Sequence, residues 1–421
     1  MERKAYTKGG IPVYIYDNEA SHSFFLSLFV KAGSIYESDG EAGITHFFEH
    51  VAIRNVNCNM GGTLYNTLDK YGLEFNASTY SEMVQFYISG APKNFALAAD
   101  IFSRLLSPIS LPKSEIDRER DRIRAEIREA DEKTSLAGFT SALVWQGTPL
   151  SRSITGTPKS VGAITGKRLE EYRRRIFSPD NLFVYITGKI TDADISTLCR
   201  LLDSYPLNVG EKHCNLAPVP QKFGKRDAEV AIKNADFTKV RFTFDIDMSE
   251  VASEEIDLLY DILLGGYSSG FFIELSERRG LCYDLMGQTE RYKNIGTLSF
   301  SYELKEGRLY EALECTVSEL SRLKSAPLSP DRLMKAGYTD NADMLLDDVR
   351  ELNFTMGYDN HVLGLDYPDI DARREKYSAV TPERIMLAAR KIFTRDNLTL
   401  TLKGNRKRID TEKIREILQG I

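Results

Sequence analysis

The feature that most constrains the fold of this 421-residue chain is a repeat that relates its two halves. Residues 164–188 align without gaps on residues 380–404, an offset of about half the chain. Both copies predict a helix, an Asp-Asn turn and a strand. A period this long indicates two duplicated domains rather than a solenoid, and chance similarity is the weaker interpretation because each copy ends its half. The identical pairs include Arg168/Arg384, Ile176/Ile392, Phe177/Phe393, Asp180/Asp396, Asn181/Asn397, Leu182/Leu398 and Gly188/Gly404.

Proline and glycine cluster between the two halves, so we expect domains at residues 1–205 and 227–421 with a linker at 206–226. Within each half, helical patterns alternate with groups of short strands. This mixture predicts an α+β fold in which each domain is a mainly antiparallel sheet backed by helices. The predicted helices cover residues 93–107, 114–132, 167–176, 254–264, 307–323, 330–350 and 382–392.

Composition narrows the class of protein. Hydrophobic residues make up 42% of the chain and charged residues 28%, values typical of a soluble globular protein. The net charge of −6 argues against nucleic acid as a main partner. No apolar run reaches the length of a membrane-spanning helix, and the first residues do not resemble a signal peptide. We therefore expect no membrane partner. Five widely spaced cysteines do not predict a disulfide framework, so we expect a cytoplasmic protein.

The motif with the clearest chemistry is His46-Phe47-Phe48-Glu49-His50, in a chain that has five histidines. On a helix, His46 and His50 lie one turn apart on the same face, and Glu49 falls beside them. Two such histidines can bind one zinc ion, and a neighbouring carboxylate can accept a proton from the attacking water. This is the H-x-x-E-H arrangement of inverzincins.

The residues before the motif place it at the start of a helix. Residues 23–30 form an apolar run that predicts a buried strand, and residues 31–40 predict a turn-rich loop. Thr45 is then a plausible N-cap.

A zinc site of this kind needs a third ligand. The other histidines are scattered and no cysteine pair has ligand spacing, so a carboxylate is the natural candidate. The predicted helix at 114–129 buries one face through its isoleucines (Ile116, Ile123 and Ile127) and is rich in glutamate. Residue properties alone do not choose among Glu115, Glu119, Glu126 and Glu129, and the usual role of such glutamates is a solvated surface.

Together these segments resemble the pitrilysin/insulysin family of zinc metallopeptidases, which includes the mitochondrial processing peptidases. The resemblance implies that His46, His50 and Glu126 bind one zinc ion per chain and that Glu49 is the general base. It also implies that Glu119, seven residues before Glu126, orients a ligand from behind.

The resemblance covers most of the chain. Gly33-Ser34 and Glu37 resemble the loop before the family's zinc helix. The segment Asn76-Ala77-Ser78-Thr79 resembles the strand that holds substrate at a sheet edge, which implies substrate-binding roles for Asn76, Ala77 and Thr79. In the second half, Tyr283 matches a family tyrosine, which implies a catalytic role in which it donates a hydrogen bond to the oxyanion or to the substrate backbone. Position 276, however, is serine where the family usually has arginine.

We therefore expect a zinc metalloendopeptidase that acts on peptides. The family often forms a chamber from two such units, which implies a homodimer or a heterodimer with a related subunit. One alternative is a catalytically weak or inactive peptide-binding subunit of the same fold, which Ser276 favours slightly. A purely structural zinc site is a third interpretation, disfavoured because Glu49 would then have no evident role.

Overall fold

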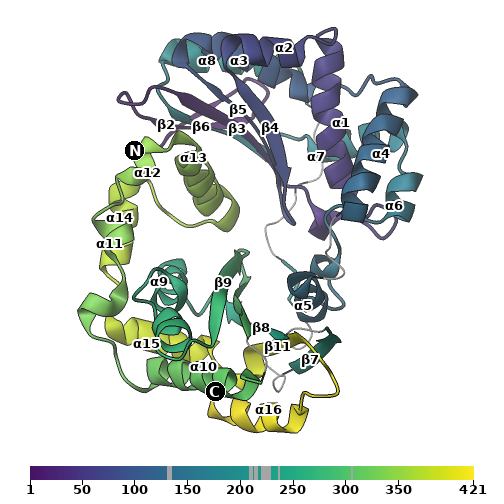
Figure 1. Ribbon diagram of the computed structural model, residues 1–421. Coiled ribbons are helices and arrows are strands. Elements are labelled where there is room, and N and C mark those ends of the chain that lie inside the picture. The colour runs from purple at the N-terminus through teal and green to yellow at the C-terminus, as the bar shows by residue number, and fades with distance from the viewer. Residues whose placement is uncertain (130–134, 208–211, 213–216, 220–228, 236–237, 305–306) are drawn as a thin grey trace. The chain divides into compact units, whose positions relative to one another are not determined.

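The computed structural model describes residues 1–129, 135–207, 212, 217–219, 229–235, 238–304 and 307–421 (Figure 1). The chain forms two compact units, each assembled from separate segments. Unit 1 contains Met1–Ala130, Arg152–Asn215 and Ala342–Ile370, and unit 2 contains Asp131–Ser151, Leu216–Asn341 and Asp371–Ile421. The domain boundaries expected at 205 and 227 stay a prediction, because most of the expected linker lies outside the described residues.

Unit 1 is built on a six-stranded sheet of order β1-β2-β6-β3-β5-β4. Its neighbouring strands are antiparallel except for the parallel pair β2 and β6. The strands are β1 (Arg3–Tyr6), β2 (Pro12–Asp17), β3 (Phe24–Val30), β4 (Glu74–Thr79), β5 (Val84–Gly90) and β6 (Leu182–Gly188). Its helices are α1 (Ile44–Asn59), α2 (Leu64–Tyr71), α3 (Phe95–Ser103), α4 (Lys113–Glu129), α6 (Pro158–Ala163), α7 (Gly166–Ile176), α8 (Asp192–Leu202), α12 (Met344–Asp347) and α13 (Val349–Tyr358).

Unit 2 repeats this plan with a five-stranded sheet of order β7-β11-β8-β10-β9, in which only the pair β7 and β11 is parallel. The strands are β7 (Glu229–Asn234), β8 (Thr238–Asp247), β9 (Cys282–Arg291), β10 (Ile295–Leu304) and β11 (Leu398–Gly404). The helices are α5 (Leu136–Val144), α9 (Ser253–Leu264), α10 (Leu309–Ser325), α11 (Ala336–Thr339), α14 (Ile370–Ser378), α15 (Pro382–Ile392) and α16 (Thr411–Ile417). The predicted α+β fold with two helix-backed, mainly antiparallel sheets is confirmed.

Both faces of the unit 1 sheet are covered, which explains the unbroken apolar run at β3. All seven residues of β3 are buried. Phe24, Leu26 and Leu28 belong to the core shared with α1, α3, α7 and α8, whereas Phe29 belongs to a second core with α13 (Figure 1). A strand buried on both faces loses the alternation of apolar and polar residues that a half-exposed strand shows.

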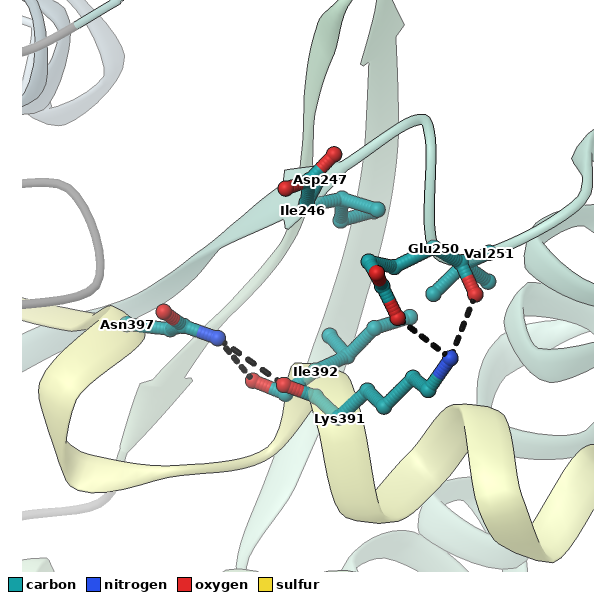
Figure 2. Close-up of a pocket in the computed structure, with 7 residues that line it drawn as sticks. All are labelled: Ile246, Asp247, Glu250, Val251, Lys391, Ile392 and Asn397. Carbon is teal, nitrogen blue, oxygen red and sulfur yellow. Dashed lines mark hydrogen bonds and ion pairs between the residues drawn. The ribbon is translucent and has the colours of Figure 1, made fainter.

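The repeat seen in the sequence has a structural counterpart. Helix α7 and strand β6 in unit 1 correspond to α15 and β11 in unit 2. Asn181 and Asn397, at matching positions, each donate a side-chain hydrogen bond to the end of the preceding helix, at the carbonyls of Ile176 (2.9 Å) and Ile392 (3.2 Å). In Figure 2, Asn397 lines a small pocket with Lys391 and Glu250, which pair with each other at 2.8 Å. The shared asparagine therefore closes the turn between helix and strand in both copies.

Each unit also contains helical segments from the other half of the sequence. Helix α13, from the second half, packs on β3 and β6, and its Asn353 is fully buried against them. Asn353 donates hydrogen bonds to the backbone carbonyls of Phe25 and Tyr185 and accepts one from Ser27. Helix α5, from the first half, packs on β11 and β8 in unit 2. The two units are thus interleaved along the chain.

The single helix expected at 330–350 is wrong, because this stretch is broken into short pieces. Met334 adopts a left-handed conformation (φ 59°), and α11 is four residues long. Asp348 then caps the next helix by accepting the N–H groups of Arg350 and Glu351, so α13 begins only at Val349. In the described part of the chain, no helix is long and apolar enough to cross a membrane.

Candidate metal centre

Helix α1 presents the histidine pair. Its apolar residues, among them Phe47, Phe48 and Val51, are buried in the core of unit 1. The helical period therefore turns His46, Glu49 and His50 toward the partly exposed side, where all three are half-buried.

The start of α1 is fixed by an acidic side chain rather than by Thr45. The N-cap is Gly43, whose left-handed backbone (φ 85°) suits glycine, and Thr45 lies in the first turn, where its hydroxyl bonds Tyr172. The Glu37 carboxylate accepts the N–H groups of Gly43 (2.9 Å) and Thr45 (3.0 Å). The expected Thr45 cap is therefore wrong, and Glu37 satisfies two of the free N–H groups that every helix start leaves.

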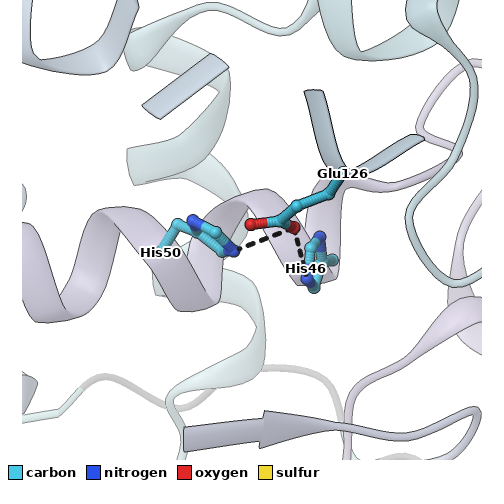
Figure 3. Close-up of side chains that lie close together, drawn as sticks. All are labelled: His46, His50 and Glu126. Carbon is cyan, nitrogen blue, oxygen red and sulfur yellow. Dashed lines mark ion pairs between the residues drawn. The ribbon is translucent and has the colours of Figure 1, made fainter. Parts of the chain in front are cut away.

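Helix α4 brings the third candidate ligand. Ile116 and Ile123 are buried and anchor α4 on the core, as predicted, which turns Glu126 toward α1. Glu126 Oε2 lies 3.7 Å from His46 Nε2 and 3.6 Å from His50 Nε2 (Figure 3). One ligand atom from each of these three side chains falls within 4.8 Å of the others, a spacing that could hold a metal ion.

Glu119, one of the glutamates that residue properties alone could not rank, supports the site from behind. It is 4% exposed, and its Oε2 lies 3.3 Å from Nδ1 of His50. A carboxylate on Nδ1 leaves the other ring nitrogen, Nε2, free to bind a metal. Arg54 lies 3.6 Å from Glu119 and 2.6 Å from Glu115, so the carboxylate is itself held. We did not predict Arg54 from the sequence, although it follows His50 at the same four-residue spacing on α1.

The electrostatics differ between the two histidines and raise the pKa of Glu49. Burial lowers the pKa of His46 to about 4, and the neighbouring His50 adds to this effect. Burial also acts to lower the pKa of His50, but the carboxylates around it, led by Glu119, raise it. Burial raises the pKa of Glu49, against the opposite effect of a hydrogen bond from Thr79. An imidazole must be neutral to bind a metal, and His46 meets that condition at neutral pH.

The donor set fits zinc. Zinc takes imidazole nitrogen and carboxylate oxygen in tetrahedral geometry at about 2.0–2.2 Å, so that its ligand atoms lie roughly 3.4 Å apart. The observed separations of 3.6 and 3.7 Å to Glu126 are close to that value. Three protein ligands with an open fourth position are the pattern of catalytic zinc sites, whereas structural sites usually have four.

Comparison with known proteins identifies the family. The family model of the insulinase-type peptidases (Peptidase family M16) matches residues 13–158, which include the whole candidate site. The model of the M16 inactive domain matches residues 163–336. The chain belongs to the M16 peptidase family. The resemblance seen in the sequence is thereby confirmed.

Relatives of this M16 chain are described as zinc proteases. An uncharacterized zinc protease of Bacillus subtilis, YmxG, is 22% identical over 93% of this chain and 96% of its own. Another, from Mycobacterium leprae, is 26% identical over 74% of this chain and 71% of its own. A protease from Helicobacter pylori has the same fold, with a TM-score of 0.79 and 16% identity over 96% of this chain and 99% of that chain. The periplasmic protease PqqL from Escherichia coli has a TM-score of 0.81 at 17% identity, covering 99% of this chain and 50% of PqqL.

The substrate-binding residues expected of an M16 peptidase lie on β4, one of the two edge strands of the unit 1 sheet as far as the structure describes it. Asn76 is exposed, and its side chain accepts the N–H of Ala77 (2.9 Å) and hydrogen-bonds Tyr87. Thr79 instead donates its hydroxyl to Oε2 of Glu49 at 2.6 Å. That hydrogen bond was not predicted, because no sequence pattern links the two positions.

The M16 residues expected in the second half lie in unit 2. Tyr283 is in β9, but its side chain lies outside the described part of the structure. Ser276 is half-buried in the irregular helix Phe272–Glu277, and its carbonyl accepts the N–H of Gly280. The role of Tyr283 toward substrate and the effect of Ser276 on substrate binding stay predictions.

Proposed function

We propose that this chain is a zinc-dependent endopeptidase, with one zinc per chain, that hydrolyses short or unfolded polypeptides. The observation that carries the proposal is the convergence of His46, His50 and Glu126 beside Glu49, a half-buried carboxylate that the metal-binding set does not use. A structural zinc site would need no such group. The relatives described as zinc proteases support the same function.

In the proposed mechanism, the metal would be held by Nε2 of His46, Nε2 of His50 and the Glu126 carboxylate. Zinc bound there would supply a Lewis acid able to polarise a carbonyl and to lower the pKa of water. Glu49 accepts the proton of the attacking water and then donates it to the leaving amine. The raised pKa of Glu49 suits both steps, because a base works best when its pKa lies near the working pH.

The substrate is proposed to bind as an extended strand along β4. Among the described residues, β4 pairs only with β5, so its outer edge presents backbone N–H and C=O groups. Pairing through the backbone asks little of the substrate's sequence, which suits a peptidase of broad specificity. Asn76, Ala77 and Thr79 provide this edge in the proposal.

The test replaces Glu49 by glutamine, which keeps the size of the side chain and removes the base. We expect zinc content equal to that of the parent chain, and peptidase activity lower by about 100-fold to 10,000-fold. The matched control is Glu171→Gln, because Glu171 is an exposed carboxylate on α7 of unit 1 that pairs with Lys167. Retained activity in a pure, zinc-loaded Glu49→Gln protein would contradict the mechanism.

A second candidate is a weak or inactive peptide-binding subunit, which Ser276 favours because the family's usual arginine is missing there. If the chain needs a partner to supply that arginine, the isolated chain will bind zinc yet cleave no peptide. Size-exclusion chromatography combined with a peptide-cleavage assay separates an active homodimer from a chain that requires a related second subunit.

We also propose a reducing, cytoplasmic location. The four cysteines in the described part of the chain, Cys58, Cys199, Cys282 and Cys315, are free thiols, which supports it. Fractionation of cells that produce the tagged chain would test this location.

A further inference from the structure

We infer that Thr79 is a positioning residue that links the substrate edge strand to the general base. Its hydroxyl holds one oxygen of Glu49, so the base has one orientation when a peptide lies along β4. This inference rests on the proposed function, because it gives Thr79 a role in the same reaction.

The hydrogen bond joins two elements that meet only in the folded chain. Thr79 is the last residue of β4, and Glu49 lies thirty residues earlier on α1. The distance of 2.6 Å from Oγ1 to Oε2 is that of a strong hydrogen bond from a hydroxyl to a carboxylate. This bond fixes the orientation of the carboxylate and leaves Oε1 and the second lone pair of Oε2 able to accept a proton.

The register of β4 explains why this hydroxyl points at α1. Side chains alternate along a strand, so Phe75, Ala77 and Thr79 share one face. Phe75 and Ala77 pack against the core that includes α1, and the small Ala77 lets the strand approach it. Threonine is also stiff about its first side-chain torsion, which limits the positions that its hydroxyl can reach.

The end of β4 is held in place by the turn that follows it. The N–H of Tyr80 bonds the carbonyl of Met83 at 2.8 Å, and the carbonyl of Ser81 accepts the N–H of Ile35 at 3.1 Å. A Cβ atom at Gly33 would lie 2.3 Å from that Ser81 oxygen, so only glycine permits this approach. Thr79 is therefore a fixed support for Glu49.

This arrangement couples the binding of peptide on β4 to the orientation of Glu49. The backbone of β4 offers the edge on which an extended peptide is proposed to pair, and the side chain of its last residue bonds the base. Any shift of β4 on pairing with peptide is transmitted to Glu49 through one hydrogen bond. Substrate binding and base orientation thus share a single residue.

The test compares Thr79→Val, which keeps the shape and removes the hydroxyl, with Thr79→Ser, which keeps the hydroxyl. We expect equal zinc content and similar KM in both variants. In Thr79→Val we expect kcat to fall about tenfold to a hundredfold, the loss typical of a hydrogen bond to a charged group, and in Thr79→Ser most of it to return. Thr67→Val, on α2, is the matched control, because the Thr67 hydroxyl donates to the carbonyl of Thr63 at the start of the same helix. An unchanged kcat in Thr79→Val, or a fall in Tm without rescue by serine, overturns the inference.

A second readout does not depend on activity. In crystal structures of the zinc-loaded variants, we expect the Glu49 carboxylate to keep its position in Thr79→Ser and to leave it in Thr79→Val. An unmoved carboxylate in Thr79→Val overturns the inference even if activity falls. If the parent chain shows no zinc-dependent cleavage, the proposed function fails, while this structural comparison still decides whether Thr79 orients Glu49.

Discussion

Replacing Glu82 by glutamine should change how the stability of unit 1 depends on pH. Glu82 follows β4, is 2% exposed, and accepts a hydrogen bond from the Tyr358 hydroxyl at 2.6 Å. Its second oxygen has no hydrogen-bond partner among the described residues. Burial therefore raises the pKa of Glu82 to about 7, against the opposite effects of Tyr358 and the Lys31 charge.

The size and sign of the effect follow from this raised pKa. Below pH 4.5, Glu82 is protonated in both the folded and the unfolded chain. As the pH rises toward about 7, the unfolded chain releases this proton while the folded chain keeps it, so stability is lost across that window. A shift of this size corresponds to about 3 kcal/mol of unfolding free energy. Glutamine cannot ionise, so the variant avoids the loss.

The assay is urea unfolding of both proteins from pH 4 to pH 8, followed by far-UV circular dichroism. We expect the unfolding free energy of Glu82→Gln, minus that of the parent chain, to grow by about 3 kcal/mol across this range. Other titrating groups cancel in the difference. Glu351→Gln, at an exposed position on α13, is the matched control for the loss of a carboxyl group. A flat difference for Glu82→Gln would refute the assignment of a buried, neutral carboxyl at position 82.

Two further predictions concern the site and the interleaved helix. Glu119→Gln should weaken zinc binding about 10-fold to 100-fold, because the carboxylate that contacts Nδ1 of His50 is removed. Asp121→Asn, at an exposed position on α4, should leave the zinc affinity unchanged. Competition with a chelating dye measures both affinities, and equal values would exclude the supporting role of Glu119. Asn353→Ala should lower the unfolding free energy by about 3–5 kcal/mol, because three buried partners lose their hydrogen bonds. Thr355→Ala, which removes an exposed hydrogen bond to Glu351, should lower it by less than about 1 kcal/mol. Similar values for the two variants in urea unfolding would contradict the packing of α13.

Local patterns in the sequence predicted the elements that depend on local chemistry. The apolar run at 23–30 forms a buried strand, and the spacing of His46 and His50 places both on one face of a helix. The repeat predicted two related sheets. Asn181 and Asn397 have the same structural role in the two copies, since each closes a helix-to-strand turn. For Glu126, the residues alone left four glutamates open, and only the family resemblance chose among them.

Interactions that no helical or strand spacing encodes could not be predicted from the sequence. Glu37 caps α1 from the preceding loop, and Thr79 donates a hydrogen bond to Glu49, which lies thirty residues earlier. Neither hydrogen bond follows from a periodic pattern in the sequence. The helix expected at 330–350 failed because Met334 adopts a left-handed backbone and Asp348 starts a new helix, choices that tertiary packing decides. The docking of α5 and α13 on the sheet of the other half likewise depends on which face each sheet leaves uncovered.

The central claim is that His46, His50 and Glu126 together bind one catalytic zinc ion. The most direct measurement is anomalous X-ray diffraction at the zinc absorption edge from crystals of the purified chain grown with one equivalent of zinc. The account predicts a single strong peak about 2.0–2.2 Å from Nε2 of both histidines and from the Glu126 carboxylate. A peak elsewhere, or zinc held by the histidines with Glu126 turned away, would contradict it.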